Sequence, residues 1–158
     1  METTYETYDV IIVGTGLAGI FCSLNLSSHL KVLVITKQKI KDSNSFLAQG
    51  GISVLKSKED FKGYMQDTLK AGKYENNQNA VEVMINQSRE VIDDLENLGV
   101  EFDKKDGEFL YTREAAHSVS RILHHKDITG EEIMTKLITK ACQRSNITFK
   151  EYCTMVDI

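Results

Sequence analysis

The feature that most constrains this chain is a glycine-rich turn that directly follows a short apolar run. Residues 10–13 are Val-Ile-Ile-Val, and the next six residues are Gly14-Thr15-Gly16-Leu17-Ala18-Gly19. An unbroken β-branched run is typical of a buried parallel strand, so we expect a strand over 8–13 and a helix over 17–26. A second apolar run predicts another strand over 30–36, which completes a βαβ unit.

Each glycine of the turn has a separate physical role. Gly14 permits the tight turn, Gly16 lets the backbone approach a pyrophosphate, and Gly19 lets helix and strand pack closely. The helix N-terminus adds unpaired N–H groups and a partial positive charge. In this context we predict dinucleotide binding, and the alternative is a glycine turn of an α/β fold that holds no ligand.

The end of the second predicted strand departs from the usual adenosine-binding pattern. Dinucleotide-binding βαβ units place Asp or Glu there to accept a hydrogen bond from a ribose hydroxyl. Here the strand ends in Ile35-Thr36-Lys37, and Asp42 already belongs to the following loop. Thr36 and Lys37 would have to replace the carboxylate, or the adenosine is held differently. Taken alone, Lys37 near a 2′-phosphate leaves NADP open as an alternative.

The rest of the chain predicts helices and short strands around this unit. The segment 37–53 has no periodicity and contains Gly-Gly, so we expect a loop. Three pairs have the spacing of a capping box and predict helix starts: Ser57 with Asp60, Asn79 with Glu82, and Thr129 with Glu132. The first two helices should end at Gly72 and Gly99. A hairpin is expected within 100–111, turning at Asp106-Gly107, and one or two strands within 147–158.

Length and composition exclude several classes of protein. With 158 residues and 41% hydrophobic content, the chain is most simply one domain with a substantial core. A net charge of −4 without a long basic run argues against nucleic-acid binding. We expect no membrane span and no signal peptide, because no apolar stretch is long enough and the N-terminus is acidic. The three cysteines include no CxxC pair, which favours reduced, mostly buried thiols in a cytoplasmic protein without a metal site.

The loop after the second strand narrows the choice of nucleotide. Residues 43–51 are Ser-Asn-Ser-Phe-Leu-Ala-Gln-Gly-Gly. Together with Ile-Thr-Lys before it, this loop resembles the succinate dehydrogenase and fumarate reductase family of flavoproteins, in which an Ala-Gln-Gly-Gly loop crosses the flavin. Small residues at 48–51 would let backbone N–H groups reach an isoalloxazine, and Gln49 offers both a donor and an acceptor.

The resemblance implies an α/β, Rossmann-like FAD-binding domain with a parallel sheet that is incomplete without C-terminal segments. The predicted cofactor-binding residues are Gly14, Thr15, Gly16, Leu17, Ala18, Gly19, Thr36, Lys37, Asn44, Ser45, Phe46, Leu47, Ala48, Gln49, Gly50 and Gly51. Respiratory members attach FAD through a histidine four residues before the alanine, and that position is Asn44 here. Because an amide is no nucleophile for that bond, we expect non-covalent FAD, which suits an oxidase better than a succinate dehydrogenase.

The segment 111–133 is the most specific stretch of the chain. It contains Thr-Arg-Glu at 112–114, His-Ser at 117–118, Arg-Ile-Leu-His at 121–124 and Asp-Ile-Thr-Gly at 127–130. This pattern resembles the branch of the family that oxidises L-aspartate. The resemblance places the substrate-orienting glutamate at Glu114, which would accept a charge-assisted hydrogen bond of roughly 1.5–3 kcal/mol from the substrate ammonium. The alternative is an exposed loop glutamate paired with Arg113 or Arg121.

Other residues of this segment carry weaker expectations. Ala115-Ala116 stands where the family usually has Gly-Gly, and a positive φ there would strain alanine by roughly 1–2 kcal/mol. The histidines do not have the spacing of a metal site, so we expect structural hydrogen bonds from His117 and His124. Arg121 is expected to organise the loop rather than to perform chemistry.

The resemblance also implies an activity. It is the FAD-dependent oxidation of L-aspartate to iminoaspartate with O2 or fumarate as acceptor, the first step of NAD biosynthesis through quinolinate, with quinolinate synthase as a candidate partner. The residues that handle the proton and clamp the substrate carboxylates lie later in that family. We therefore expect residues 1–158 to be the N-terminal part of the FAD-binding domain, without capping and C-terminal helical domains, and inactive alone. The alternatives are a fumarate reductase-type flavoprotein and a non-catalytic nucleotide-binding module.

Overall fold

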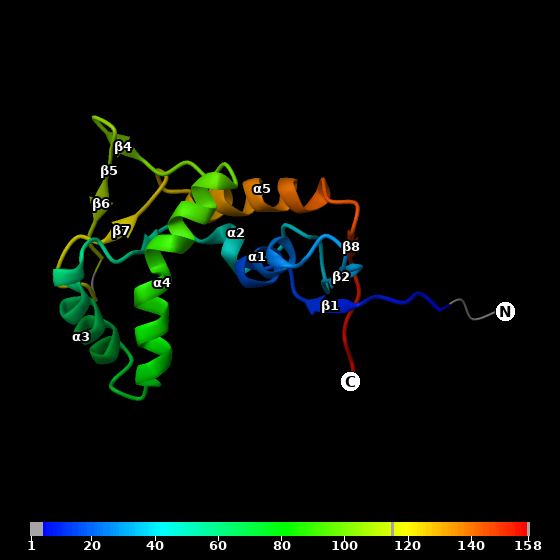
Figure 1. Cartoon of the computed structure of the whole chain (residues 1–158), viewed down its shortest axis with the longest axis horizontal. Helices are drawn as coiled ribbons and strands as arrows, with labels where there is room; N and C mark the ends of the chain where they lie inside the picture. Colours follow the sequence, from blue (N-terminus) through cyan, green and yellow to red (C-terminus); the bar gives the residue numbers. More distant parts are fainter. Residues whose placement is uncertain (1–4, 115, 158) are drawn as a thin grey trace. The chain divides into compact units, whose positions relative to one another are not determined.

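The computed structural model describes residues 5–114 and 116–157, which form two compact units. Of the described residues, the first unit comprises 5–48 and 130–157, and the second comprises 49–114 and 116–129. Figure 1 shows the elements of both along the chain. Composition predicts a single domain and does not anticipate this division. The chain divides in this way because the segment 49–129 forms a hydrophobic core of its own.

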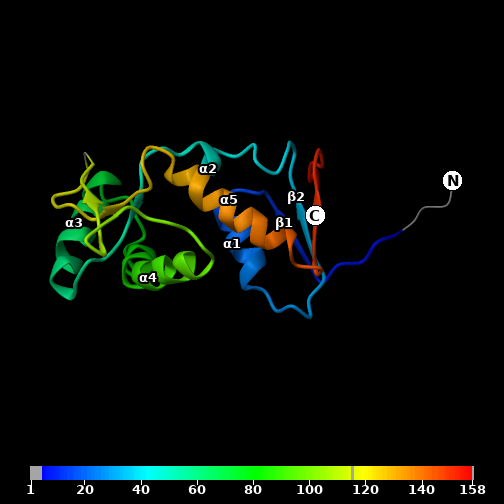
Figure 2. The same ribbon diagram turned by 90° about the horizontal axis from the view of Figure 1, so that it is seen from above.

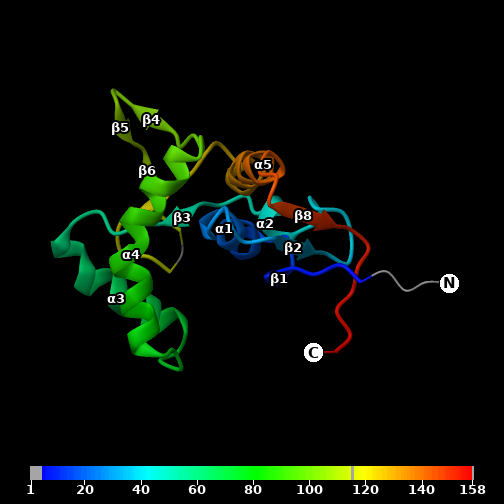
Figure 3. The same cartoon turned by 45° about the vertical axis from the view of Figure 1, so that its right-hand side comes forward.

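The first unit is a parallel sheet with helices on one face. Its strands are β1 (Val10–Val13), β2 (Val32–Ile35) and β8 (Ile147–Lys150), in the order β1-β2-β8 (Figure 3). Helix α1 (Leu17–Asn25) connects β1 to β2, and α5 (Thr129–Cys142) precedes β8. Both helices lie on the same side of the strands (Figure 2), as right-handed crossovers in one direction require. The predicted βαβ unit and parallel sheet are confirmed.

Burial in this sheet is one-sided. Val32 and Val34 of β2 are fully buried, whereas Ile11 and Val13 of β1 are 59% and 54% exposed. The prediction of a buried first strand is therefore wrong, because two residues of β1 are exposed and the other two, Val10 and Ile12, are only half-buried. Successive side chains of a strand point to opposite faces, and the helices of this unit cover only one of them.

The second unit combines two helices with small antiparallel sheets. Its helical elements are the 3₁₀ turn η1 (Lys58–Asp60), α3 (Phe61–Ala71) and α4 (Gln78–Asn97). One sheet has the order β3-β7-β6, from β3 (Ile52–Ser53), β7 (Ile122–Leu123) and β6 (Tyr111–Thr112). Figure 3 shows α3 beside α4, where Tyr64, Val81 and Ile85 form a buried cluster.

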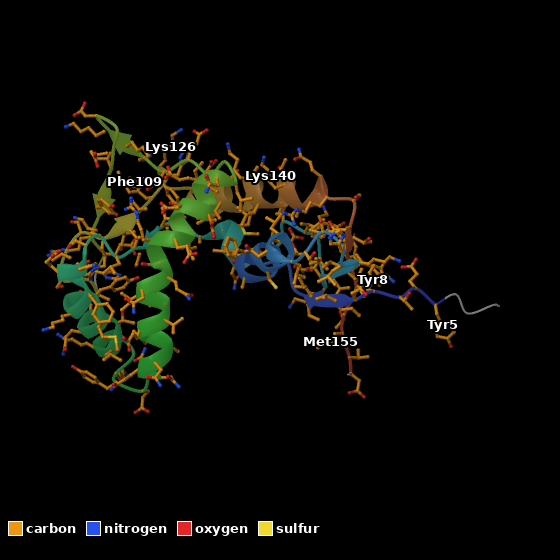
Figure 4. The ribbon with its side chains drawn as sticks, in the orientation of Figure 1. Tyr5, Tyr8, Phe109, Lys126, Lys140 and Met155 are labelled. Carbon is orange, nitrogen blue, oxygen red and sulfur yellow. The ribbon has the colours of Figure 1, made fainter. Side chains whose placement is uncertain are left out.

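The expected hairpin is present. It pairs β4 (Lys104–Lys105) with β5 (Glu108–Phe109). Asp106 and Gly107 have φ values of 53° and 86°, as a two-residue turn of the primed type needs. Phe109, labelled in Figure 4, lies with its ring centroid 6.2 Å from that of Phe102, which anchors the hairpin.

Several local predictions are corrected by tertiary contacts. The segment 37–53 is not all loop, because Ser43 caps a short helix, α2 (Asn44–Leu47), by accepting from the Phe46 N–H at 3.2 Å. Asn77 rather than Asn79 caps α4. The cap predicted at Ser57 does not form, because its side chain accepts no capping hydrogen bond and Asp60 pairs with Arg121. Helix α5 begins at Thr129 as predicted, and the Thr129 hydroxyl donates to the Gly50 carbonyl at 2.6 Å.

Other predictions of helix ends and cysteines can be compared directly. Helix α3 is followed by Gly72, and α4 by Gly99 with φ of 94°, both as expected. All three cysteines are free, but Cys22 and Cys142 are exposed rather than buried. Among the described residues, no helix is both long and apolar enough to cross a membrane.

Candidate functional site

The glycine turn of the first unit has the geometry of a phosphate-binding loop. Gly14 has a φ of 107°, which L-residues rarely adopt, and an added Cβ there would meet no atom within 4 Å. A Cβ on Gly19 would lie 2.2 Å from the Gly14 carbonyl oxygen. The turn therefore leaves open space at Gly14. At Gly19, where α1 packs on the turn, it tolerates no side chain. Gly16 precedes α1 as its N-cap without a side-chain oxygen, so the helix N-terminus suits a bound anion.

A cavity of about 340 Å³ lies next to this turn. It is lined by Val13, Gly14, Thr15, Gly16, Ile35, Thr36, Lys37, Asp42, Ser43, Cys153, Thr154 and Met155. The cavity brings the predicted residues Thr15, Thr36 and Lys37 together with the glycines. It opens at the carboxyl ends of the parallel strands, where ligands of such sheets bind.

The sequence interpretation missed seven residues of this cavity, two of which, Val13 and Ile35, end strands β1 and β2. Asp42 and Ser43 come from the loop after β2, and residues 153–155 come from the segment after β8, where Figure 4 labels Met155. One signal in the sequence could have found residues 153–155. If the last predicted strand joins the parallel sheet, the segment after it lies at the same edge as the ends of β1 and β2, because parallel strands end at a common edge. The position of that strand beside β2 depends on the pairing of Val32 with Ile147, which no local pattern specifies.

Helix α2 packs against the glycine turn. The backbone N–H of Leu17 donates to the Ser45 hydroxyl at 3.0 Å, and a Cβ on Gly16 would lie 3.3 Å from that oxygen. On its other side, Gly130 donates to the Ala48 carbonyl at 2.9 Å. The predicted cofactor residues of 44–48 thus lie with the glycine turn, whereas Gln49, Gly50 and Gly51 belong to the second unit.

In the second unit, the end of this loop lies against Glu114. Glu114 lines a cavity of about 600 Å³ together with Gln49, Gly50, Thr112, His124, Lys126 and Asp127. A Cβ on Gly50 would lie 2.7 Å from Oε1 of Glu114, and one on Gly51 would lie 2.2 Å from the Leu123 carbonyl oxygen. At Gly51 only glycine allows this approach to the backbone, whereas at Gly50 the nearest atom belongs to the flexible, exposed side chain of Glu114, which lies next to these predicted cofactor residues.

A fully buried arginine lies behind the Glu114 loop. Arg121 is 0% exposed, and it donates to both carboxylate oxygens of Asp60, at 3.1 and 2.8 Å, and to Asp67 at 2.5 Å. Its guanidinium lies 4.9 Å from the ring centroid of Tyr64. The hydrogen bonds to Asp60 in particular raise its pKa above the usual value. Because the two aspartates occupy this guanidinium, the alternative in which Glu114 pairs with Arg121 does not hold.

The hydrogen bonds of His117 define its tautomer. Nδ1 lies 2.9 Å from Nη1 of Arg121, and Nε2 lies 3.2 Å from the Ser53 hydroxyl. A guanidinium can only donate, so Nδ1 must accept and the ring proton must sit on Nε2. Ser53 then accepts from His117, which is opposite to the arrangement of a nucleophile activated by a general base.

This network fixes the turn that carries Glu114. The His117 N–H donates to the Glu114 carbonyl at 3.0 Å, and both the N–H and the hydroxyl of Ser118 donate to Asp67 at 2.7 Å. The structural roles predicted for His117 and Arg121 are confirmed. Of the two alanines, Ala115 lies outside the described residues, and Ala116 is not among the residues with positive φ.

His124 also makes a structural contact. Its Nδ1 lies 3.3 Å from the Asp103 carboxylate, and its carbonyl accepts from the Asp103 N–H at 2.8 Å. Within residues 5–114 and 116–157, no group of three His, Cys, Asp or Glu side chains is arranged to hold a metal ion.

We expect the Asp67 carboxylate to make the stability of the protein depend on acidic pH. Burial raises the pKa of Asp67, but hydrogen bonds from Ser118 and Arg121 outweigh burial and lower it from 3.8 to about 2. Its stabilising effect is therefore complete above about pH 4 and is lost as the pH falls to about 2. The unfolding free energy of Asp67→Asn should be about 1–2 kcal/mol below that of the wild type at neutral pH, with the difference vanishing near pH 2.

Urea titrations at several pH values measure this difference. The control is Asp93→Asn, which removes an exposed carboxylate 3.7 Å from Arg89 and should change stability by less than about 1 kcal/mol at any pH. A gap between wild type and Asp67→Asn that does not narrow with acid would contradict the prediction.

Comparison with known proteins places the glycine turn and the Glu114 loop within a family of flavin-binding domains. The family described as FAD binding domain matches residues 9–158. The chain is 47% identical over 150 residues to an L-aspartate oxidase of Clostridium perfringens, which covers 95% of this chain and 34% of that protein. It is 42% identical over 151 residues to an L-aspartate oxidase of Clostridium acetobutylicum, with 95% of this chain and 35% of that protein covered. The chain thus spans about a third of the length of these relatives.

A solved structure shows the same fold. A quinol fumarate reductase of E. coli superposes with a TM-score of 0.85 at 23% sequence identity, which covers 92% of this chain and 26% of that chain. At this identity the likeness supports the fold alone, and it agrees with the α/β class and parallel sheet described above.

Proposed function

Because the chain belongs to the family of FAD binding domains, whose cofactor is FAD, we propose that it forms the FAD-binding part of an enzyme that oxidises L-aspartate to iminoaspartate. The observation that carries the proposal is the position of Glu114, with its carboxylate against the backbone of Gly50. The substrate follows from that residue and from the names of relatives that are up to 47% identical. The whole activity is a proposal, since the chain spans about a third of those proteins.

The residues of the first unit would hold the dinucleotide. The open backbone at Gly14 and the N-terminus of α1 would bind the pyrophosphate, while Thr36 and Lys37 lie in the same cavity for the adenosine side. Asn44 begins α2 and has no nucleophilic nitrogen, which supports non-covalent binding. When bound, FAD supplies the two-electron redox chemistry of such a reaction.

The residues of the second unit would select the substrate. A carboxylate at Glu114 attracts the ammonium of aspartate, which succinate lacks, by a charge-assisted hydrogen bond. The backbone carbonyl of Glu114 accepts from the His117 N–H, and the His117 ring contacts Arg121, so the buried network supports the backbone that carries this exposed carboxylate. Gln49 lines the same cavity and offers a donor and an acceptor.

The proposal includes the context of the reaction. The electron acceptor would be O2 or fumarate, the reaction would be the first step of NAD biosynthesis through quinolinate, and quinolinate synthase is the partner that would consume the product. The three free thiols favour a cytoplasmic location. We further propose that residues 1–158 are the N-terminal part of the FAD-binding domain and bind FAD without turning over aspartate, because the described residues include no group to which we assign proton transfer.

An anaerobic absorption experiment tests the proposal. The chain reconstituted with FAD should show a bound-flavin spectrum that L-aspartate perturbs but does not bleach. We expect succinate to perturb it only at concentrations about 10-fold higher, since one charge-assisted hydrogen bond is missing. Glu114→Gln should remove most of this preference, because a neutral amide attracts an ammonium less strongly.

The control variant is Glu108→Gln, which removes a carboxylate of the β4–β5 hairpin outside the Glu114 cavity and should keep the preference. A chain that binds no flavin would contradict the cofactor role, and bleaching by aspartate would contradict the inactivity of residues 1–158. An equal response to aspartate and succinate in the wild type would favour a fumarate reductase-type flavoprotein.

A further inference from the structure

We propose that Asp42 is the carboxylate that binds the adenosine ribose of FAD, and that it excludes nucleotides with a 2′-phosphate. This inference rests on the FAD-binding part of the proposed function. Strand β2 ends at Ile35 and is followed by Thr36 and Lys37, so the usual acidic residue at the strand end is missing. The structure supplies an acidic group from a position seven residues beyond that end, and it lines the same cavity as the glycine turn.

The loop between β2 and α2 folds back on itself to place Asp42. The Asp42 N–H donates to the Lys39 carbonyl at 3.0 Å, and the Lys39 N–H donates to the Asp42 carboxylate at 3.3 Å. The loop is also tied to the segment after β8, because the Ile40 N–H donates to the Glu151 carboxylate at 2.8 Å. These bonds hold the loop closed without a proline or a long helix, and Asp42 therefore occupies a defined position.

The surroundings of Asp42 match the chemistry of a ribose. The cavity also contains the backbone of Gly14 and Gly16 for the pyrophosphate and the hydroxyl of Thr36. An ionised carboxylate only accepts hydrogen bonds, and ribose hydroxyls are donors. In dinucleotide-binding βαβ units this contact normally comes from an acidic residue near the end of the second strand. Asp42 offers the same acceptor from the loop.

The charges in the cavity also determine which nucleotide is excluded. Lys37 alone would favour a 2′-phosphate, which leaves NADP open on the sequence. Asp42 lines the same cavity and has the opposite sign, so a phosphate on the 2′-oxygen would meet a carboxylate where a hydroxyl would donate to it. Like charges at such short range are unfavourable, whereas the ribose hydroxyl gains a charge-assisted hydrogen bond. The pair therefore favours FAD over 2′-phosphorylated nucleotides.

Titration with FAD, followed by the quenching of flavin fluorescence, tests the ribose contact. Asp42→Asn keeps an acceptor for the Lys39 N–H but removes the charge, and we expect FAD to bind about 10-fold more weakly. The matched control is Glu151→Gln, a carboxylate that accepts from the same loop but does not line the cavity. It should bind FAD within about twofold of the wild type, because the amide oxygen can still accept from Ile40.

Calorimetry with two smaller nucleotides tests the exclusion. Adenosine 5′-monophosphate and adenosine 2′,5′-bisphosphate differ only by the 2′-phosphate. The wild type should prefer the monophosphate at least about 10-fold, and Asp42→Asn should lose most of this preference. If the wild type binds FAD and Asp42→Asn matches Glu151→Gln in both experiments, the role of Asp42 is overturned and FAD binding stands. If the wild type binds no FAD, the proposed function fails together with this inference.

Discussion

Replacing Gly16 with alanine is expected to weaken FAD binding about 100-fold while the protein remains folded. Gly16 has an ordinary φ of −68°, and an added Cβ would meet only the Ser45 hydroxyl, at 3.3 Å. A small shift of that hydroxyl accommodates the methyl group in the free protein. A bound pyrophosphate would be displaced by the same methyl group and would lose about two charge-assisted hydrogen bonds, or roughly 3 kcal/mol.

Flavin fluorescence titration measures this affinity, and thermal unfolding of the FAD-free protein measures the fold. The matched control is Gly63→Ala on α3, where an added Cβ would have ordinary contacts of 3.6 Å or more with Arg121, Asp60 and Ser118. It should bind FAD as the wild type does. An unchanged affinity in Gly16→Ala would mean that the backbone at Gly16 does not approach the ligand closely, which would contradict the proposed orientation of the dinucleotide on α1.

Replacing Arg121 with alanine is expected to destabilise the second unit by about 3–5 kcal/mol. The substitution leaves Asp60 and Asp67 as partly buried charges without their shared partner, and unpaired buried charges are among the most costly changes in a protein. It also removes the donor to His117 Nδ1 and the contact with the Tyr64 ring. Because a domain is stable by only about 5–15 kcal/mol, much of this unit should unfold under mild denaturant.

Urea unfolding, with hydrogen exchange to separate the two units, measures this effect. Arg89→Ala is the control, since Arg89 pairs with Asp93 at 3.7 Å on the exposed surface of α4 and should contribute less than about 1 kcal/mol. Arg121→Met combined with Asp60→Asn and Asp67→Asn should recover part of the loss, because it removes the uncompensated charges. Equal effects of Arg121→Ala and Arg89→Ala would contradict the central role of the buried network.

The elements predicted from sequence alone were those with a strong local pattern. The β-branched run before Gly14 and the helical spacing after it were sufficient for β1, α1 and β2. The turn at Asp106-Gly107 was predicted because few residues adopt positive φ there. Capping was less well predicted, because a side chain such as Asp60 can satisfy either a nearby N–H or a distant guanidinium. Sequence spacing does not say which partner it takes.

The residues of the candidate site also fall into two groups: those that a local sequence pattern predicts and those that depend on tertiary contacts. The glycine turn and the loop 44–51 were identified from sequence, since their conformations depend on glycine and on small residues at fixed positions. The position of Asp42 in the cavity beside the glycine turn was not identified from sequence, because it depends on a loop closed by hydrogen bonds that involve Lys39 and Glu151. The exposed face of β1 was missed as well, since burial depends on which face α1 and α5 cover.

The βαβ unit, the glycine turn and the loop that resembles a flavin-binding segment can all be predicted from the sequence. These properties follow from the backbone preferences of neighbouring residues and from hydrophobic periods of two and 3.6 residues. Three further features depend on tertiary contacts: Arg121 is buried between Asp60 and Asp67, Gly50 lies against Glu114, and the described residues form two units. Contacts between residues some 60 positions apart in sequence arise when a whole core folds, because their strength comes from desolvation and packing that no local segment can provide.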